Sequence, residues 1–223
     1  EFSITFSVTD GATGAVNATS VFTLAFGTWD YPTLDARLVP PAADSAVHDG
    51  GSYFRMNLGE YVDVSADGNT VIASTTKRYG TTGNYNVGGC YIFVRSGGTW
   101  TVQATLQPTL SGATANPGTS TYAKNYGRNA CISDDGNTVA FSNASVTPYE
   151  TVVYTRSGTT WTLEQTIIPA GTIATVTQMY SPSISGDGNT IAIGGHGSNS
   201  NAYIGSTGAV FVYTRSGSTW TQQ

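Results

Sequence analysis

Short runs of alternating or continuous apolar residues, separated by turn residues, fill most of the chain. One stretch contains four of them in a row, at residues 61–65, 70–74, 89–95 and 99–106. Runs of this length are typical of antiparallel β-strands. An Asp-Gly pair separates the first two runs and a Ser-Gly-Gly segment separates the last two, and both favour tight turns because glycine tolerates positive φ. The pattern therefore predicts a meander of four strands.

The same pattern occurs three times, because two strings of sequence recur. The string Ser-x-Asp-Gly-Asn-Thr begins at residues 65, 133 and 185, and the string Arg-Ser-Gly-x-Thr-Trp begins at residues 95, 156 and 215. Four strands in a repeat of about 60 residues suit the blade of a β-propeller. We predict an all-β fold of propeller-like blades, each of four antiparallel strands, belonging to a larger propeller. The three repeats are expected at about residues 52–110, 111–170 and 171–223.

Parts of these repeats resemble a known family. The matching segments of the first repeat are Leu58-Gly59, Ser65-Ala66-Asp67-Gly68-Asn69-Thr70 and Gly89-Cys90-Tyr91-Ile92-Phe93. They are similar to the FG-GAP repeat of integrin alpha-type β-propellers and of large bacterial surface and phage structural proteins. The second repeat keeps Tyr126-Gly127, whereas the third has Met179-Tyr180 where the family has glycine. The resemblance spans about residues 52–223 and implies a repeated structural module.

The first 51 residues follow a different pattern. Residues 3–26 predict a β-hairpin, with alternating apolar positions in both halves. For residues 1–30 two interpretations stay open: the end of an immunoglobulin-like module, or a degenerate blade in which Asp10-Gly11 and Trp29 take the places of the recurring strings. Residues 31–51 are expected to be a linker, with an outer strand near residues 33–40.

Composition and charge exclude several partners. The 223 residues carry a net charge of −5 and a pI near 4.7, so no basic surface is available for nucleic acid or anionic lipid. The longest apolar runs, such as residues 90–94, are far shorter than the roughly 20 residues that span a bilayer. The chain begins at Glu1, which we interpret as a processed product or a piece of a longer protein.

The sequence contains none of the motifs that we looked for as signs of catalysis. The two histidines, His48 and His196, lie in expected loops, and neither a nucleophile elbow nor a zinc-binding spacing is present. We therefore expect that the protein is not an enzyme. The only metal that the sequence suggests is calcium, near Asp67, Asp135 and Asp187. These carboxylates supply too few oxygen ligands for a calcium site, which takes six to eight. The favoured interpretation is a turn in which each aspartate accepts backbone N–H groups.

Cysteines and tryptophans have predicted structural roles. Cys90 and Cys131 fall on non-equivalent strands, which favours buried free thiols over a disulfide. Trp100, Trp161 and Trp220 follow the same turn in each repeat, and we expect them to occupy equivalent, largely buried positions at the start of each outermost strand, packed between neighbouring blades.

Two long polar loops are expected at residues 76–88 and 195–208. The default interpretation is plain solvated loops, and the alternative is a lectin-like or protein-docking surface. Equivalent loops of a propeller emerge on one face, where such folds place their binding sites, so the candidate ligand-facing residues are Tyr79, Tyr85, His196 and Tyr203. The sequence favours a non-catalytic structural and interaction module of a large extracellular or virion-surface protein. Its expected partners are other copies or other domains of the same large protein. The alternative is a glycan- or receptor-binding adhesin module.

Overall fold

The structure is a computed structural model that covers residues 1–223. It describes residues 2–8, 20–26, 36–41, 58–76, 87–108, 126–143, 149–170, 176–197 and 209–223. The chain divides into two compact units, Glu1–Arg37 and Leu38–Gln223. Both are all-β in their described residues, where no helix occurs that is long and apolar enough to cross a bilayer.

The first unit contains the expected β-hairpin. Strands β1 (Phe2–Val8) and β2 (Ser20–Phe26) pair antiparallel, and the backbone register places Ile4 opposite Leu24 and Phe6 opposite Phe22. This register aligns the apolar positions of the two halves, as their period of two predicts. Both interpretations of residues 1–30 include this hairpin, and both stay predictions.

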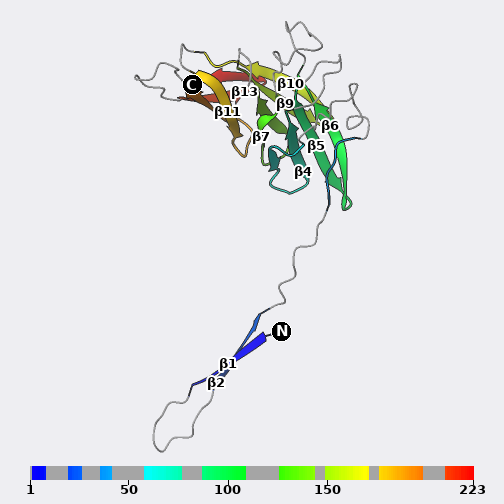
Figure 1. Ribbon diagram of the computed structural model, residues 1–223, viewed down its shortest axis with the longest axis vertical. Coiled ribbons are helices and arrows are strands. Elements are labelled where there is room, and N and C mark those ends of the chain that lie inside the picture. Colours follow the sequence, from blue (N-terminus) through cyan, green and yellow to red (C-terminus); the bar gives the residue numbers. More distant parts are fainter. Residues whose placement is uncertain are drawn as a thin grey trace, which may run out of the picture. The chain divides into compact units, whose positions relative to one another are not determined.

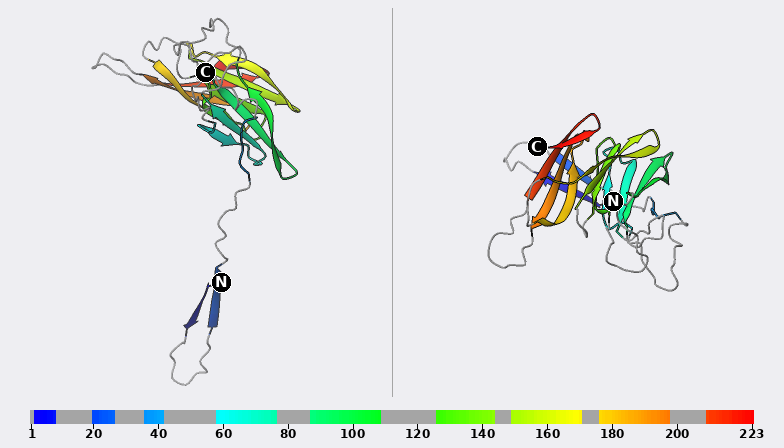
Figure 2. Two further views of the ribbon diagram at one scale, coloured as in Figure 1. Left: turned by 45° about the vertical axis from the view of Figure 1, so that its right-hand side comes forward. Right: turned by 90° about the horizontal axis from the view of Figure 1, so that it is seen from above.

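The second unit contains three sheets of four antiparallel strands, each in chain order (Figures 1 and 2). Blade 1 (residues 58–108) consists of β3 (Val62–Val64), β4 (Thr70–Thr75), β5 (Gly89–Ser96) and β6 (Thr99–Leu106). Blade 2 (residues 126–170) consists of β7 (Arg128–Ile132), β8 (Thr138–Ser142), β9 (Thr151–Ser157) and β10 (Thr160–Ile167). Blade 3 (residues 176–223) consists of β11 (Val176–Ile184), β12 (Thr190–Gly197), β13 (Ala209–Ser216) and β14 (Thr219–Gln222). The predicted fold class is confirmed: these are β-propeller-like blades.

The blades lie side by side and pack face to face (Figure 2, right). We call the side of a blade that meets the following blade its forward face, and the opposite side its rear face. In blade 1 the forward face includes Ile72, Cys90 and Ile92, which pack in one core against Ile132 and Val139 of blade 2. A second core joins the forward face of blade 2 to the rear face of blade 3. Burial on both sides explains why the inner strands lack clean alternation.

The outer strand expected near residues 33–40 is not found in the described part of that segment. Residues 36–41 have no strand assignment; Pro40 and Pro41 have no N–H to donate to a strand ladder. The segment still packs on the blades: Leu38 joins Leu58 against the rear face of blade 1, where Tyr91 and Phe93 are buried.

The meander separates two ends of the blades. Every β-turn that carries a recurring string joins the first strand to the second or the third to the fourth, and antiparallel order places all these turns at one end. We call it the turn end. The second strands end, and the third strands begin, at the opposite end, which we call the loop end.

Candidate functional site

The turn end is built from aspartates that hold their own turns together. In blade 1, Oδ1 of Asp67 accepts hydrogen bonds from Oγ of Ser65 (2.6 Å) and from the backbone N–H of Asn69 (2.9 Å). The backbone N–H of Thr70 in turn donates to Oγ of Ser65 (3.0 Å). Asp135 and Asp187 make the same contacts in their blades. The predicted turn role of these aspartates is confirmed.

These hydrogen bonds hold the aspartates in the ionised form. The Ser65 hydroxyl and the Asn69 backbone N–H lower the pKa of Asp67 to about 2. The pKa of Asp187 is lowered by the same two kinds of donor. Partial burial opposes the shift at Asp135, but hydrogen bonds from Ser133 and Asn137 outweigh it and its pKa is also lowered. All three carboxylates are therefore negative at neutral pH.

An arginine connects the two recurring strings within each blade. Nε of Arg95 donates to Oδ1 of Asn69 (3.1 Å), and its guanidinium carbon lies 5.5 Å from the ring centroid of Trp100, within the range of a cation–π contact. The same pair of contacts recurs for Arg156 in blade 2 and Arg215 in blade 3. Turn, arginine and tryptophan thus form one repeated unit, which we call the clasp.

The clasp of one blade also binds the preceding blade. Nε1 of Trp161 donates to Oε1 of Gln103 (2.9 Å), and Nε1 of Trp220 donates to Oε2 of Glu164 (2.8 Å). Arg215 completes the second contact as an ion pair with Glu164, at 3.4 Å. Gln103 and Glu164 occupy the same place, three residues after the tryptophan of their own blade. The sequence did not indicate these partners.

The three tryptophans occupy equivalent positions at the start of β6, β10 and β14, as predicted. Their burial differs: Trp220 is 4% exposed, whereas Trp100 and Trp161 are half-buried. Trp220 is a member of the buried core between blades 2 and 3, whereas Trp161 and Trp100 pack only at the edges of their cores. The Gln165 side chain of blade 2 also hydrogen-bonds to the backbone N–H and the carbonyl oxygen of Trp220. The expectation of largely buried rings therefore holds for Trp220 and is too strong for Trp100 and Trp161.

The loop end contains a buried polar cluster of Tyr126, Asn143 and Glu150. The Tyr126 hydroxyl donates to Oε1 of Glu150, and the Glu150 backbone N–H donates to Oδ1 of Asn143 (3.3 Å). Burial, and then the Glu150 carboxylate, raise the pKa of Tyr126, so it stays protonated. The Tyr126 backbone also binds Val87 and Gly89 of blade 1. The cluster closes the junction of blades 1 and 2; the sequence singled out Tyr126-Gly127 but not Glu150.

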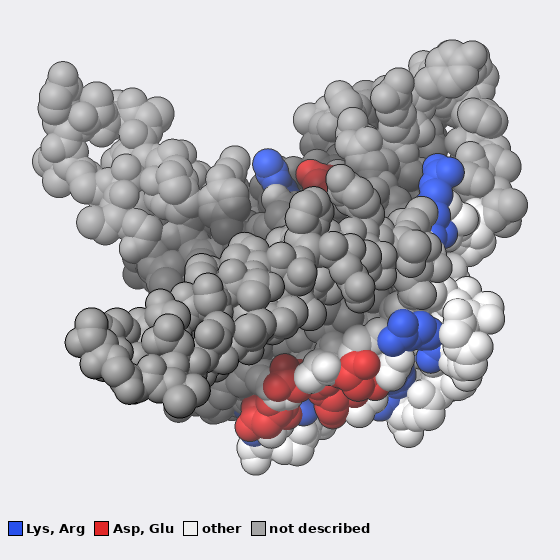
Figure 3. All heavy atoms as spheres, turned by 90° about the horizontal axis from the view of Figure 1, so that it is seen from below, with Lys and Arg blue, Asp and Glu red and all other residues white. Residues whose placement is uncertain are grey.

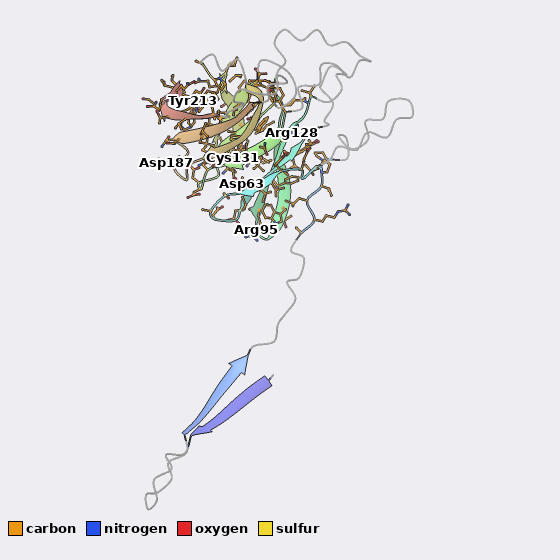
Figure 4. The ribbon with its side chains drawn as sticks, turned by 60° about the vertical axis from the view of Figure 1, so that its left-hand side comes forward. Asp63, Arg95, Arg128, Cys131, Asp187 and Tyr213 are labelled. Carbon is orange, nitrogen blue, oxygen red and sulfur yellow. The ribbon has the colours of Figure 1, made fainter. Side chains whose placement is uncertain are left out.

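The two cysteines are buried free thiols, as expected. Burial raises the pKa of Cys90 well above its usual value and raises that of Cys131 to about 12, with a further contribution from Asp63. Figure 4 shows Asp63 and Cys131 close together, where Oδ2 of Asp63 accepts the backbone N–H of Ile132 at 2.9 Å. Thiols in this state are poor nucleophiles and poor metal ligands.

The candidate ligand-facing residues are only partly placed. Tyr79, Tyr85 and Tyr203 lie outside the described residues, as does His48. The backbone of His196 lies in β12, opposite Gln178, so its expected place in a loop was wrong; β12 extends further than its Gly-His-Gly sequence suggested. The His196 side chain is outside the described part of the structure.

Acidic side chains gather on the face of the blades that is seen from below, with basic side chains beside them (Figure 3). Over the described ranges, no three His, Cys, Asp or Glu residues are grouped so that they could hold a metal ion. The carboxylate oxygens of Asp67 and Asp135 are already acceptors for serine and asparagine donors. The residues that are described thus offer calcium no preformed ligand set.

The blades and their repeated clasps define the class: an all-β protein built of β-propeller-like blades. No protein-family model matches the chain, and no curated protein matches it. Among solved structures it is similar to a Bacteroides uniformis protein named as a 6-phosphogluconolactonase (13% identity, TM-score 0.43, covering 72% of this chain and 38% of that chain). It is also similar to TolB from Acinetobacter baumannii (10%, TM-score 0.38, 72% and 31%) and a protein named as TolB from Agrobacterium tumefaciens (12%, TM-score 0.40, 98% and 60%). The chain spans less than two thirds of each of these structures.

Proposed function

We propose that this chain is a structural and interaction module of a large extracellular or virion-surface protein, and that it works without catalysis. The observation that carries the proposal is the clasp. Its polar groups bind within and between blades: Arg156 binds Asn137 of its own blade, and Gln103 and Thr70 of the preceding blade. These side chains recur in every repeat, and they hold each blade together and bind it to its neighbour. Such an arrangement suits a protein that bears mechanical load or that separates other domains.

The ionisation states support a role without catalysis. A general acid or base works best with a pKa near the operating pH. The three turn aspartates have lowered pKa values, and the pKa values of Tyr126 and of both thiols are raised. These shifts move the pKa values further from pH 7. At neutral pH the aspartates therefore stay ionised, and the tyrosine and the thiols stay protonated.

The resemblance to FG-GAP repeats supports the proposed location and partners. Repeats of this kind occur in surface proteins of bacteria and in phage structural proteins, which suits an extracellular or virion-surface location. The partners are then other copies or other domains of the same large protein. The low charge and the pI near 4.7 suit contact with protein rather than with nucleic acid or lipid headgroups.

Surface labelling tests this proposal. Antibodies raised against the folded chain should label intact cells or particles of the source without permeabilisation, whereas antibodies against an internal protein should not. Esterase, lactone and glycoside substrates should be hydrolysed no faster by the chain than by buffer. Labelling that requires permeabilisation, or turnover that a point substitution abolishes, would contradict the proposed role.

A glycan- or receptor-binding adhesin module is the second candidate. It is favoured by the topology, because β4, β8 and β12 all end at the loop end, so the connections that carry Tyr79 and Tyr203 start from the same end. A glycan array separates the two candidates. An adhesin should bind a defined glycan and lose it in Tyr79→Ala or Tyr203→Ala, while Tyr79→Phe keeps a ring that can stack on sugar. A structural module should bind none of the arrayed glycans.

A further inference from the structure

The forward face of blade 3 differs in exposure from the forward faces of blades 1 and 2. Counting back from the arginine of the clasp, Cys90, Thr151 and Val210 are equivalent. The first two are 0% exposed, whereas Val210 is 69% exposed. Two residues further on, Ile92 and Val153 are 0% exposed, whereas Val212 is 38% exposed. Positions that are core in two blades are therefore open surface in the third.

The rear face of blade 1 has the complementary difference. Val62 and Val64 of β3 are 64% and 51% exposed, whereas Ile132, the counterpart of Val64 in blade 2, is 6% exposed. Leu38 and Leu58 cover the part of this face around Tyr91 and Phe93, so the open part lies along β3.

The glycines of the first turn in each blade also differ between the open faces and the packed faces. A Cβ on Gly136 would lie 3.0 Å from Oγ1 of Thr70 in blade 1, and a Cβ on Gly188 would lie 3.0 Å from Oγ1 of Thr138 in blade 2. A Cβ on Gly68, their counterpart in blade 1, would meet no atom of the described residues within 4 Å. Thr190 is the counterpart of Thr70 and Thr138 on blade 3; it is half-buried, whereas they are buried. Each end thus presents one half of the same contact.

Hydrogen bonds between neighbouring blades also repeat, and blade 3 carries the groups that would form the next set. Backbone N–H groups donate from Ala66 to the Asp134 carbonyl (2.9 Å) and from Asp134 to the Gly186 carbonyl (3.0 Å), and the N–H of Gly186 stands in the equivalent place on blade 3. Gln223 lies three residues after Trp220, where Gln103 and Glu164 accept the next indole N–H in the first two blades.

We propose that the forward face of blade 3 binds the rear face of blade 1 of a second copy of this chain, in a head-to-tail contact. The two open faces are the two halves of an interface that the chain forms twice within itself, between blades 1 and 2 and between blades 2 and 3. Gly68 of the second copy would lie over Thr190, and Val62 and Val64 would cover the apolar surface around Val212. Such a contact joins different surfaces, so it propagates into rings or filaments. This inference rests on the proposed function, because it names the partner and the surface of the interaction module.

Sedimentation velocity tests the contact. The chain should associate beyond a dimer as its concentration rises. Val212→Asp on one face and Val62→Asp on the other should each raise the dissociation constant at least about tenfold, because each would bury an unpaired carboxylate. Leu163→Asp is the matched control: Leu163 is 46% exposed on blade 2 and lies on neither open face. Val210→Asp provides a second forward-face variant, and thermal unfolding confirms that each variant is folded.

Mixing the two face variants gives the decisive result. Each variant alone should be monomeric, because its intact face meets only a blocked one. A one-to-one mixture should form a heterodimer and no larger species, because the forward face of the Val62→Asp chain still fits the rear face of the Val212→Asp chain. A mixture that stays monomeric would overturn the proposal, as would a parent chain that is monomeric at all concentrations or whose association Val212→Asp leaves unchanged. None of these outcomes depends on surface labelling or on substrate turnover, so the proposed function can stand or fall separately.

Discussion

Nε of Arg156 donates a 3.0 Å hydrogen bond to Oδ1 of Asn137, and the Arg156 backbone N–H donates to the Asn137 carbonyl oxygen at 2.8 Å. These two residues belong to the two strings that recur along the chain, one at each tight turn of blade 2. Their contact explains why the strings recur together: asparagine in the first turn and arginine in the second are the two halves of one side-chain contact.

A double-mutant cycle measures this contact. Asn137→Ala and Arg156→Ala should each destabilise the fold, and the double variant should lose less than the sum of the two. We expect a coupling free energy of about 1 kcal/mol, because the donor is charged and the pair is partly buried. Urea unfolding provides the measurement. Strict additivity of the two single effects would show that the hydrogen bond contributes nothing.

The turn glycines separate backbone strain from contact between blades. Gly68 and Gly136 have φ of 68° and 69°, so alanine at either position meets the same left-handed strain of about 1–2 kcal/mol. Gly136→Ala should cost more than Gly68→Ala, because only its Cβ approaches Thr70 and Ser65 of the preceding blade. The measurement is the difference in unfolding free energy. Equal losses would argue against close packing of the turns.

Local signals in the sequence were enough to predict the strands. The Asp-Gly and Ser-Gly turns fix where β4 begins, where β5 ends and where β6 begins to within a residue or two, because each turn needs a glycine with positive φ. Local signals did not predict that residues 36–41 would lie against blade 1 without a strand assignment.

Contacts between blades could not be predicted in the same way. That Trp161 binds Gln103, or that Tyr126 binds Glu150, depends on how separate sheets stack. No periodicity within one repeat encodes this stacking. The candidate binding residues Tyr79, Tyr85 and Tyr203 lie outside the described residues, and for their segments the sequence offers only composition.

The tryptophans should differ in their contribution to stability. Trp220→Ala should cost about 3–5 kcal/mol, since its ring is almost fully buried against blade 2. Trp161→Ala should cost less because its ring is half-buried. Trp220→Phe keeps much of the packing but removes the N–H that binds Glu164, so it should fall between the parent and the alanine variant. A Trp220→Ala protein as stable as the parent would contradict the proposed packing between blades.

Acid should destabilise the turns. The pKa of Asp67 is lower in the folded chain, about 2, than its ordinary value of 3.8, so the unfolded chain takes up the proton first as the pH falls. The stabilisation is therefore fully present above about pH 5 and is lost between about pH 4 and pH 2. Urea midpoints across this range should fall less steeply in Asp67→Asn than in the parent. The effect should persist at high salt, because hydrogen bonds rather than distant charges cause the shift.

Calcium should not be needed for folding. The oxygens of Asp67 accept hydrogen bonds from Ser65 and from the backbone and side chain of Asn69, so binding calcium there would break the turn that the carboxylate stabilises. After chelation, millimolar calcium should leave the melting temperature where it was, and magnesium serves as the control for ionic strength. A ligand that binds only the folded state at about 100 times its dissociation constant adds about 2.7 kcal/mol of stability. A rise of several degrees with calcium but not with magnesium would therefore reveal a site at the turn end, and Asp67→Asn, Asp135→Asn and Asp187→Asn would then show which blade holds it.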